Sequence, residues 1–271
     1  MCERKVYKDN SFCQIHSISS KLNSKSKDII VLGSGGAGTV VYDKKCPDLA
    51  FKIGHAKINK CGLWSIEYKY YVDICKNKPQ TTFSHAKLIS INDFEMFDNG
   101  CIMSMERVIN PIDANATYTI QANFGQETVD YKHEQRGRFL GIKELREIIK
   151  APLEPYVYDL GRLLSSIIFV GMNDCYDIEV FLGSGDVRST AFGDKNSHML
   201  YVADFDLSLP IKKFDKKTIE RIVWALQAVP YFPIQEVDKY LYNSFEKGFI
   251  DIAKTTEYLN EALLILKMYN E

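Results

Sequence analysis

Four residues near the N-terminus have a spacing that could bind phosphate. Gly33, Gly35, Gly38 and Val40 fit the pattern G-x-G-x-x-G-x-V. Glycines allow the backbone of a hairpin to approach phosphate oxygens with its amide groups facing them. A dinucleotide-binding fingerprint would need a helix directly after the glycines, whereas a β-branched run follows here. The spacing therefore favours a phosphate-binding hairpin over a dinucleotide site.

A lysine in an apolar segment is the second candidate. Lys52 lies in the run 49–53, which has the composition of a strand, and burying its ammonium without an anionic partner would be costly. Nucleotide phosphates could be that partner, and Glu67, on a helix expected over 63–74, could pair with the ammonium and orient it. The alternative is that Lys52 extends its head into solvent and that Glu67 is an ordinary surface residue.

Three carboxylates in the C-terminal half complete the set. Asp174 and Glu179 follow a long apolar helix, and Asp204 ends a β-type run. Carboxylate oxygens suit Mg²⁺, so Glu179 and Asp204 are candidate metal ligands. Asp174 is the candidate catalytic base, with Asp177 as an alternative.

Together these motifs resemble those of protein kinases, in which a glycine loop, a strand lysine, a helix glutamate, a catalytic-loop aspartate and a strand-end aspartate follow in this order. The resemblance implies ATP and Mg²⁺ as cofactors. Segment 101–108 resembles the strand and hinge that bind adenine, with Met103 and Met105 lining the ring, although buried methionines are also typical of plain core.

The chain departs from the kinase pattern at several positions. Met172 and Asn173 replace His and Arg, Tyr176 replaces a phosphate-binding lysine, and Asp206 replaces the final glycine of D-F-G. No A-P-E follows, and the interval from Asp174 to Asp204 is long. An alternative register through residues 194 and 196 leaves too short an interval for the usual hairpin.

Residues 156–252 also resemble a fungal domain-of-unknown-function family with kinase-like organisation, sometimes found in proteins labelled zinc-finger proteins. The resemblance rests on D-C-Y-D-I-E-V-F-L-G at 174–183, D-F at 204–205, and A-V-P-Y-F-P at 228–233 before an aromatic-rich helix. It implies a kinase-like fold without a known activity. The chain lacks the paired Cys/His spacings of a zinc finger.

Hydrophobic periodicity predicts the elements that position these residues. Strands are expected at 29–32, 39–42, 49–53, 86–91, 100–108, 179–182 and 199–203, and helices at 63–74, 145–149, 156–170, 218–228, 234–249 and 256–269. We therefore expect one α+β, bilobal, protein-kinase-like unit over residues 1–271. An antiparallel-sheet lobe with one helix would span 26–109, and a mainly helical lobe 110–271, with part of 110–141 as a variable insertion.

Composition narrows the partners and the compartment. A net charge of −1 gives no general reason to expect nucleic acid, and no apolar run approaches the length of a membrane span. The seven cysteines are odd in number and lack CxxC pairs, which predicts reduced thiols in a cytoplasmic or nuclear protein.

The sequence thus predicts an atypical kinase-like phosphotransferase that uses Mg-ATP on a hydroxyl acceptor, a protein in preference to a small molecule. One alternative is a pseudokinase that acts as a nucleotide-binding or scaffold module. Another is a small-molecule kinase of the aminoglycoside or choline type, favoured by the short segment after Asp206. Neither the acceptor nor the oligomeric state can be predicted from these residues.

Overall fold

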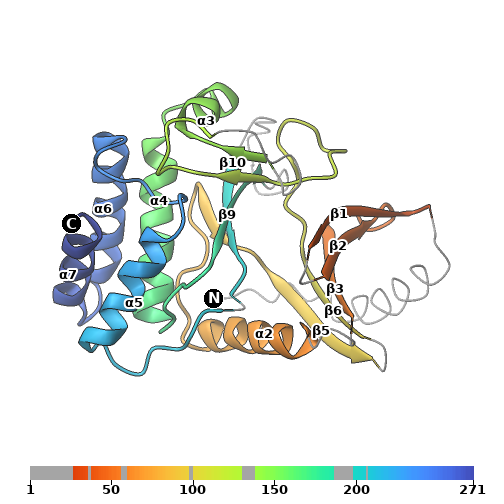
Figure 1. Ribbon diagram of the computed structural model, residues 1–271, viewed down its shortest axis with the longest axis horizontal. Coiled ribbons are helices and arrows are strands. Elements are labelled where there is room, and N and C mark those ends of the chain that lie inside the picture. Colours follow the sequence, from red (N-terminus) through yellow and green to blue (C-terminus); the bar gives the residue numbers. More distant parts are fainter. Residues whose placement is uncertain are drawn as a thin grey trace.

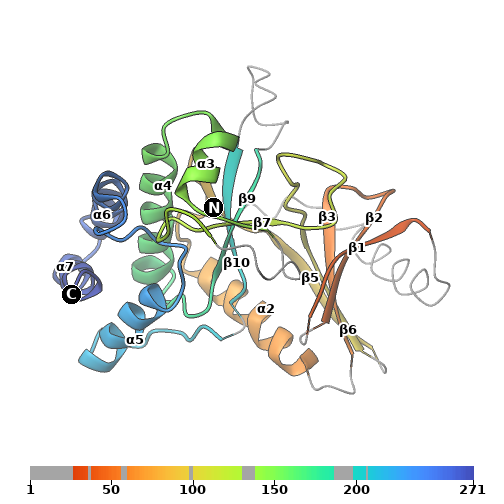
Figure 2. The ribbon, with the colours of Figure 1, turned by 45° about the horizontal axis from the view of Figure 1, so that its top comes forward.

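The computed structural model describes residues 27–35, 38–55, 60–97, 100–129, 138–185, 198–205 and 207–271. The chain is an α+β protein in which two five-stranded sheets combine with helices (Figure 1). Figure 2 places the first sheet at one end of the molecule and helices α4 to α7 at the other. This agrees with the α+β prediction, while the kinase-like assignment stays a prediction.

The first sheet has the strand order β1-β2-β3-β6-β5, and every neighbouring pair is antiparallel. Its strands are β1 (Ile29–Gly35), β2 (Gly38–Asp43), β3 (Leu49–His55), β5 (Ile91–Phe97) and β6 (Gly100–Glu106). Helix α2 (Lys60–Lys76) follows β3 and packs on β3, β5 and β6. Among the described residues, the expected strands β1, β2, β3 and β6 and the helix after β3 are present, whereas β5 was not predicted.

The second sheet has the order β4-β10-β9-β7-β8, from strands β4 (Ala86–Leu88), β7 (Ile120–Ala122), β8 (Arg138–Leu140), β9 (Glu179–Ser184) and β10 (His198–Ala203). The prediction that residues 86–91 form one strand of the N-terminal sheet is wrong. β4 pairs with β10 in parallel, because Ala86 and Leu88 are buried in the core of the second sheet. β7 and β8 come from the segment in which an insertion was expected.

Helix α4 packs on the second sheet on the side away from the first, α6 packs on α4, and α3 lies at the top of the sheet in Figure 1. The helices of this part of the chain are α3 (Ile142–Ile149), α4 (Glu154–Ser165), which continues as a π-helical turn over Ser166–Val170, α5 (Lys216–Gln227), α6 (Lys239–Ala253) and α7 (Leu259–Tyr269). Aspartates cap two of them. Asp215 accepts from Thr218 N at the start of α5, and Asp238 accepts from Tyr240 N and Leu241 N at the start of α6.

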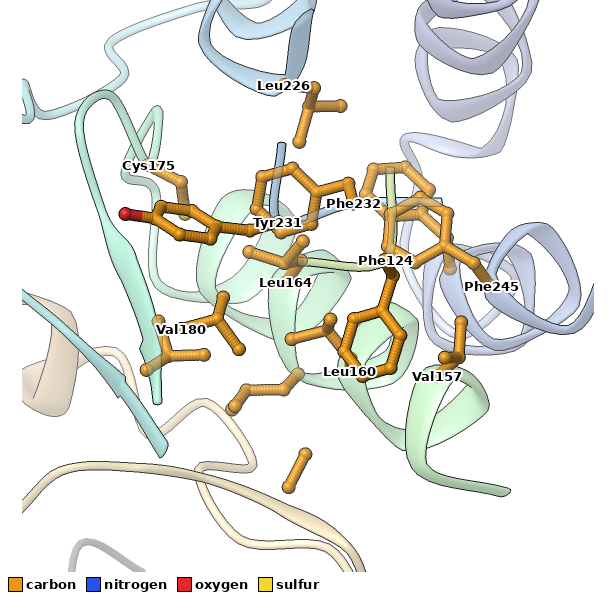
Figure 3. Close-up of a cluster of buried hydrophobic side chains, with 14 of the residues drawn as sticks. Phe124, Val157, Leu160, Leu164, Cys175, Val180, Leu226, Tyr231, Phe232 and Phe245 are labelled. Atoms are coloured by element: carbon orange, nitrogen blue, oxygen red, sulfur yellow. The ribbon is translucent and has the colours of Figure 1, made fainter. Parts of the chain in front are cut away.

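One large core joins the second sheet to these helices. It includes Phe124, Val157, Leu160, Leu164, Val180, Leu226, Tyr231, Phe232 and Phe245, which Figure 3 shows converging from several segments. Helices α4 and α6 approach closely because Gly161 and Gly248 lack side chains. A Cβ at Gly161 would lie 2.3 Å from Phe245 O, and one at Gly248 would lie 2.0 Å from Tyr158 O.

A disulfide corrects the prediction that all the cysteines are reduced. Cys61, in the first turn of α2, is bonded to Cys101 on β6. Both side chains are buried and share a small apolar cluster with Trp64. Sequence spacing gave no sign of this bond because the two cysteines are 40 residues apart and only the packing of α2 on the sheet brings them together. Cys46, Cys75 and Cys175 remain thiols.

Candidate functional site

Lys52 connects three elements of the fold. From the middle of β3, its Nζ lies 2.9 Å from Oε2 of Glu67 on α2 and 3.2 Å from Oδ1 of Asp204, directly after β10. The Lys52 and Glu67 side chains are only 12% and 4% exposed. Because a buried lysine needs anionic partners, these contacts account for its place in an apolar strand. The ion pair expected from the spacing is therefore present, and it reaches Asp204 as well.

Asp204 has an unusual backbone. Its φ is 66°, in the left-handed region that residues with a side chain rarely adopt. The preceding residue, Ala203, is the last of β10 and pairs with Glu179, the first of β9. Such conformations persist where the surrounding structure holds them, and they occur often at functional sites. Asp204 is thus fixed beside the start of β9, with a third of its side chain exposed.

Two further carboxylates share this corner. Burial, followed by the neighbouring charge of Asp204 and a smaller effect of Asp177, raises the pKa of Glu179 to about 7 against the opposing effect of Lys52. Burial, followed by the charge of Asp204, also raises the pKa of Asp177, whose φ of 62° is again left-handed. The site therefore concentrates more negative charge than Lys52 alone neutralises.

Two residues that sequence reasoning missed support Glu179. Gln121 on β7 is hydrogen-bonded to the Glu179 side chain, which lowers the glutamate's pKa, and Tyr231 donates from its hydroxyl to Gln121 Oε1 at 3.3 Å. Burial and the charges of Glu179, Asp177 and Asp204 raise the Tyr231 pKa, which places its hydroxyl near the carboxylates. Figure 3 shows this hydroxyl pointing away from Phe232 and the rest of the apolar cluster.

A sequence signal for these two residues existed only in part. Tyr231 belongs to the A-V-P-Y-F-P stretch that carries the family resemblance. Gln121 lies in the segment interpreted as a variable insertion, where nothing marked it. Its place beside Glu179 follows from the pairing of β7 with β9.

Asp174, the candidate base, has a different set of partners. Its Oδ1 accepts from Leu209 N at 2.8 Å and from Tyr176 N at 3.2 Å, and its Oδ2 lies 2.8 Å from Nε of Arg221 on α5. Burial raises its pKa, opposed first by these backbone hydrogen bonds and then by Arg221. Asp174 thus connects the 174–177 turn to α5. Asp177 is instead the residue whose pKa is raised by the charge of Asp204.

The glycine motif lies on the β1–β2 hairpin. Gly35 pairs with Gly38, and Gly33 has open space where a side chain would project; residues 36 and 37 lie outside the described part of the chain. Gly38 has a φ of 152° and faces α2, where an added Cβ would lie 2.4 Å from the Trp64 ring. Gly38 is therefore required by packing, whatever its role toward a ligand.

Val40 and the two methionines take positions in the same sheet. Val40 and Met103 both pair with Lys52, on β2 and β6 respectively. Met103 is fully buried, and Met105 packs against a separate apolar cluster that includes Val108 and Tyr201.

The chemistry of the carboxylates fits a hard divalent cation. Asp177, Glu179 and Asp204 offer only oxygen donors. Burial and then the charge of Asp204 raise the pKa values of Asp177 and Glu179, and a bound cation would counteract this. In the described ranges, no three His, Cys, Asp or Glu side chains already stand in a metal-binding arrangement. Asp206 lies outside the described residues, as do residues 194 and 196 of the alternative register.

Comparison with known proteins gives no assignment, since no protein-family model matches the chain and no curated protein matches it at a significant level. Among the helices of the described residues, none is both long and apolar enough to span a membrane.

Proposed function

We propose that this chain is a kinase-like phosphotransferase that binds ATP with Mg²⁺ and transfers the γ-phosphoryl group to a hydroxyl acceptor. The observation that carries the proposal is the contact of Lys52 with both Glu67 and Asp204. It joins the first sheet, its helix and the end of β10, and active kinases require the same lysine–glutamate ion pair together with a strand-end aspartate that binds Mg²⁺.

Each residue then has a distinct role. Lys52, oriented by Glu67, would contact phosphate oxygens beneath the β1–β2 hairpin. Asp204 and Glu179 would hold Mg²⁺, and Gln121 would keep the Glu179 carboxylate in place. Bound Mg²⁺ would offset the negative charge on the phosphates. The rest of the acceleration would come from positioning and fixed charge.

We assign the acceptor-orienting role to Asp177 in preference to Asp174. Both carboxylate oxygens of Asp174 are occupied by backbone amides and Arg221, so little accepting capacity remains. Asp177 lies close enough to Asp204 for that charge to raise its pKa. A carboxylate there could accept the hydroxyl proton as the acceptor oxygen bonds to phosphorus.

A binding module without catalysis is the second candidate, and Trp64 favours it. The indole is fully buried, packs against Gly38 and Gly54, and lies 5.1 Å from Lys52 Nζ. A ring between the glycine hairpin and the lysine takes up space on the side of the sheet from which Lys52 would reach phosphates. This favours a binding module over a phosphotransferase, whether of the protein-kinase type or of the aminoglycoside or choline type.

The test compares the thermal unfolding of wild type, Lys52→Ala and Asp204→Asn with Mg²⁺ alone, ATP alone and both. Ligand that binds the native state raises Tm by mass action, so wild type should show a Mg²⁺-dependent ATP shift that both variants lose. Lys87→Ala is the matched control, since Lys87 is also a partly buried strand lysine, paired with Glu106 and placed over the ring of Tyr201. It should keep the shift.

Transfer of the terminal phosphate from labelled ATP, to added protein or to water, then separates the two candidates. A shift with turnover supports the enzyme, and a shift without turnover supports the binding module. Equal shifts in wild type and both variants would mean that Lys52 and Asp204 do not form the nucleotide site.

A further inference from the structure

We propose that the Cys61–Cys101 disulfide is a redox-controlled tether that holds Glu67 against Lys52 and so regulates the candidate nucleotide site. This inference rests on the proposed function only for its effect on nucleotide. The tether itself is a property of α2 and β6.

The face of α2 that meets the sheet begins at the disulfide. Cys61, Trp64 and Glu67 follow at three-residue intervals, and all three are buried. Residues three apart are neighbours on one helix surface, so the three contacts form a row. Cys61 bonds to Cys101, Trp64 packs beside Gly38 and Gly54, and Glu67 meets Lys52.

The two ends of α2 are anchored differently. Toward its C-terminal end, Ile74 and the partly buried Tyr71 belong to the large core. Toward its N-terminal end, the helix rests on the small cluster of Cys61, Trp64 and Cys101, against which Phe94 packs. Loss of the covalent bond therefore acts on the half of the helix that carries Glu67.

The strand beside Cys101 has a glycine where a side chain would meet the sulfur. Gly54 pairs with Cys101 across β3 and β6, and an added Cβ there would lie 2.8 Å from Cys101 Sγ. Glycine inside a strand is unfavourable unless something approaches closely. Gly54 therefore leaves the space that the Cys101 sulfur of the disulfide occupies.

The chemistry is thiol–disulfide exchange with a low-molecular-weight disulfide such as oxidised glutathione. One cysteine thiolate attacks the small disulfide and releases one glutathione thiolate. The second cysteine thiolate attacks the resulting mixed disulfide and releases the other. Two protein thiols become one disulfide, two glutathione thiols form, and the thiol protons pass to them through solvent. Reduction by glutathione is the reverse.

The experiment equilibrates the full chain in oxidised or reduced glutathione and confirms the state of Cys61 and Cys101 by alkylation and mass measurement. Hydrogen exchange is then measured across 60–76, and Mg-ATP affinity is measured in both states. We expect reduction to speed exchange in the half of α2 nearest Cys61 and to weaken Mg-ATP binding by about fivefold or more, the usual scale of coupling between sites.

Three variants sharpen the test. Cys61→Ser should resemble the reduced protein in both buffers, while Cys75→Ser, a change on the same helix at a residue outside the disulfide, should respond like wild type. In Glu67→Gln, reduction should still speed hydrogen exchange in α2 but should no longer change the Mg-ATP affinity. The reason is that this substitution already weakens the contact between residue 67 and Lys52 that the disulfide maintains.

The outcomes separate the tether from the proposed function. Redox-dependent exchange in a protein that binds no nucleotide in either state would support the tether and contradict the function. Equal exchange in both states, or faster exchange with unchanged affinity, would overturn the inference and leave the function standing. Failure of the disulfide to form in oxidised glutathione would also overturn it.

Discussion

Replacing Glu179 with glutamine should stabilise the protein at neutral and alkaline pH. The pKa of this carboxyl is about 7, against an ordinary value of 4.5, and each unit of displacement corresponds to about 1.4 kcal/mol. The full displacement is therefore worth about 3 kcal/mol. Because the side chain is only partly buried, solvent screening lowers our expectation to about 2 kcal/mol.

The sign follows from proton linkage. Between pH 4.5 and about 7 the folded protein binds a proton at Glu179 that the unfolded chain has released, so this residue's contribution to stability falls as pH rises through that window. Glutamine has the shape of the protonated acid and does not titrate. Glu179→Gln should match wild type below pH 4.5 and exceed it by the full amount above pH 7.

The assay is thermal or urea unfolding in a chelator at pH 4 to 8, where the gain at pH 8 should be about 5 °C in Tm. Glu147→Gln, at an exposed position on α3, is the matched control and should show no pH-dependent difference. Added Mg²⁺ should stabilise wild type more than Glu179→Gln and so narrow the gap. A Glu179→Gln protein less stable than wild type at pH 8 would refute the reasoning, since it would mean that the charge is compensated in the fold.

Gly161→Ala should lower the free energy of unfolding by about 3 kcal/mol, because its Cβ would meet Phe245 O and push α4 from α6; urea unfolding measures this. Asp174→Asn should cost about 2 kcal/mol, since asparagine has one acceptor oxygen where the carboxylate has two and Arg221 would lose its charged partner. Asp177→Asn should leave stability unchanged or raise it, because burial and Asp204 disfavour its charge, yet should abolish phosphoryl transfer in a labelled-ATP assay.

Specific results would contradict these three expectations. Gly33→Ala is the control for Gly161→Ala, since the space around it is open; equal losses in both would remove the packing argument. Transfer retained by Asp177→Asn but lost in a fully folded Asp174→Asn would return the acceptor-orienting role to Asp174.

Local patterns were enough to predict most of the first sheet and the contact at its centre. Apolar runs and glycine turns marked β1, β2, β3 and β6, and the cost of burying an amine singled out Lys52. Glu67 followed from its place on the next helix. These inferences worked because each depends on neighbouring residues, on the periodicity of one element, or on a strong energetic penalty.

Long-range pairing was beyond that reasoning. The sequence of β4 predicts a further strand of the first sheet, and only its parallel pairing with β10 shows otherwise. β7 is too short to show the alternation of apolar and polar residues that marks a strand. Two acids three residues apart, Asp174 and Asp177, fit the same motif. Their partners in the fold separate them, since Asp174 contacts Arg221 on α5 and backbone amides, whereas Asp177 lies near Asp204. A sequence pattern gives the interval between residues and leaves open which side chain faces which element.

The second sheet explains why the missed residues belong to the site. The order β10-β9-β7 places the end of β10 beside the start of β9, with β7 next in line. A row of polar side chains therefore crosses these strands. It consists of Asp204 directly after β10, Glu179 at the start of β9 and Gln121 on β7. Tyr231 ends this row and connects it to the aromatic core. A substitution in that core which shifts Tyr231 should therefore alter the site through Gln121 without touching any carboxylate.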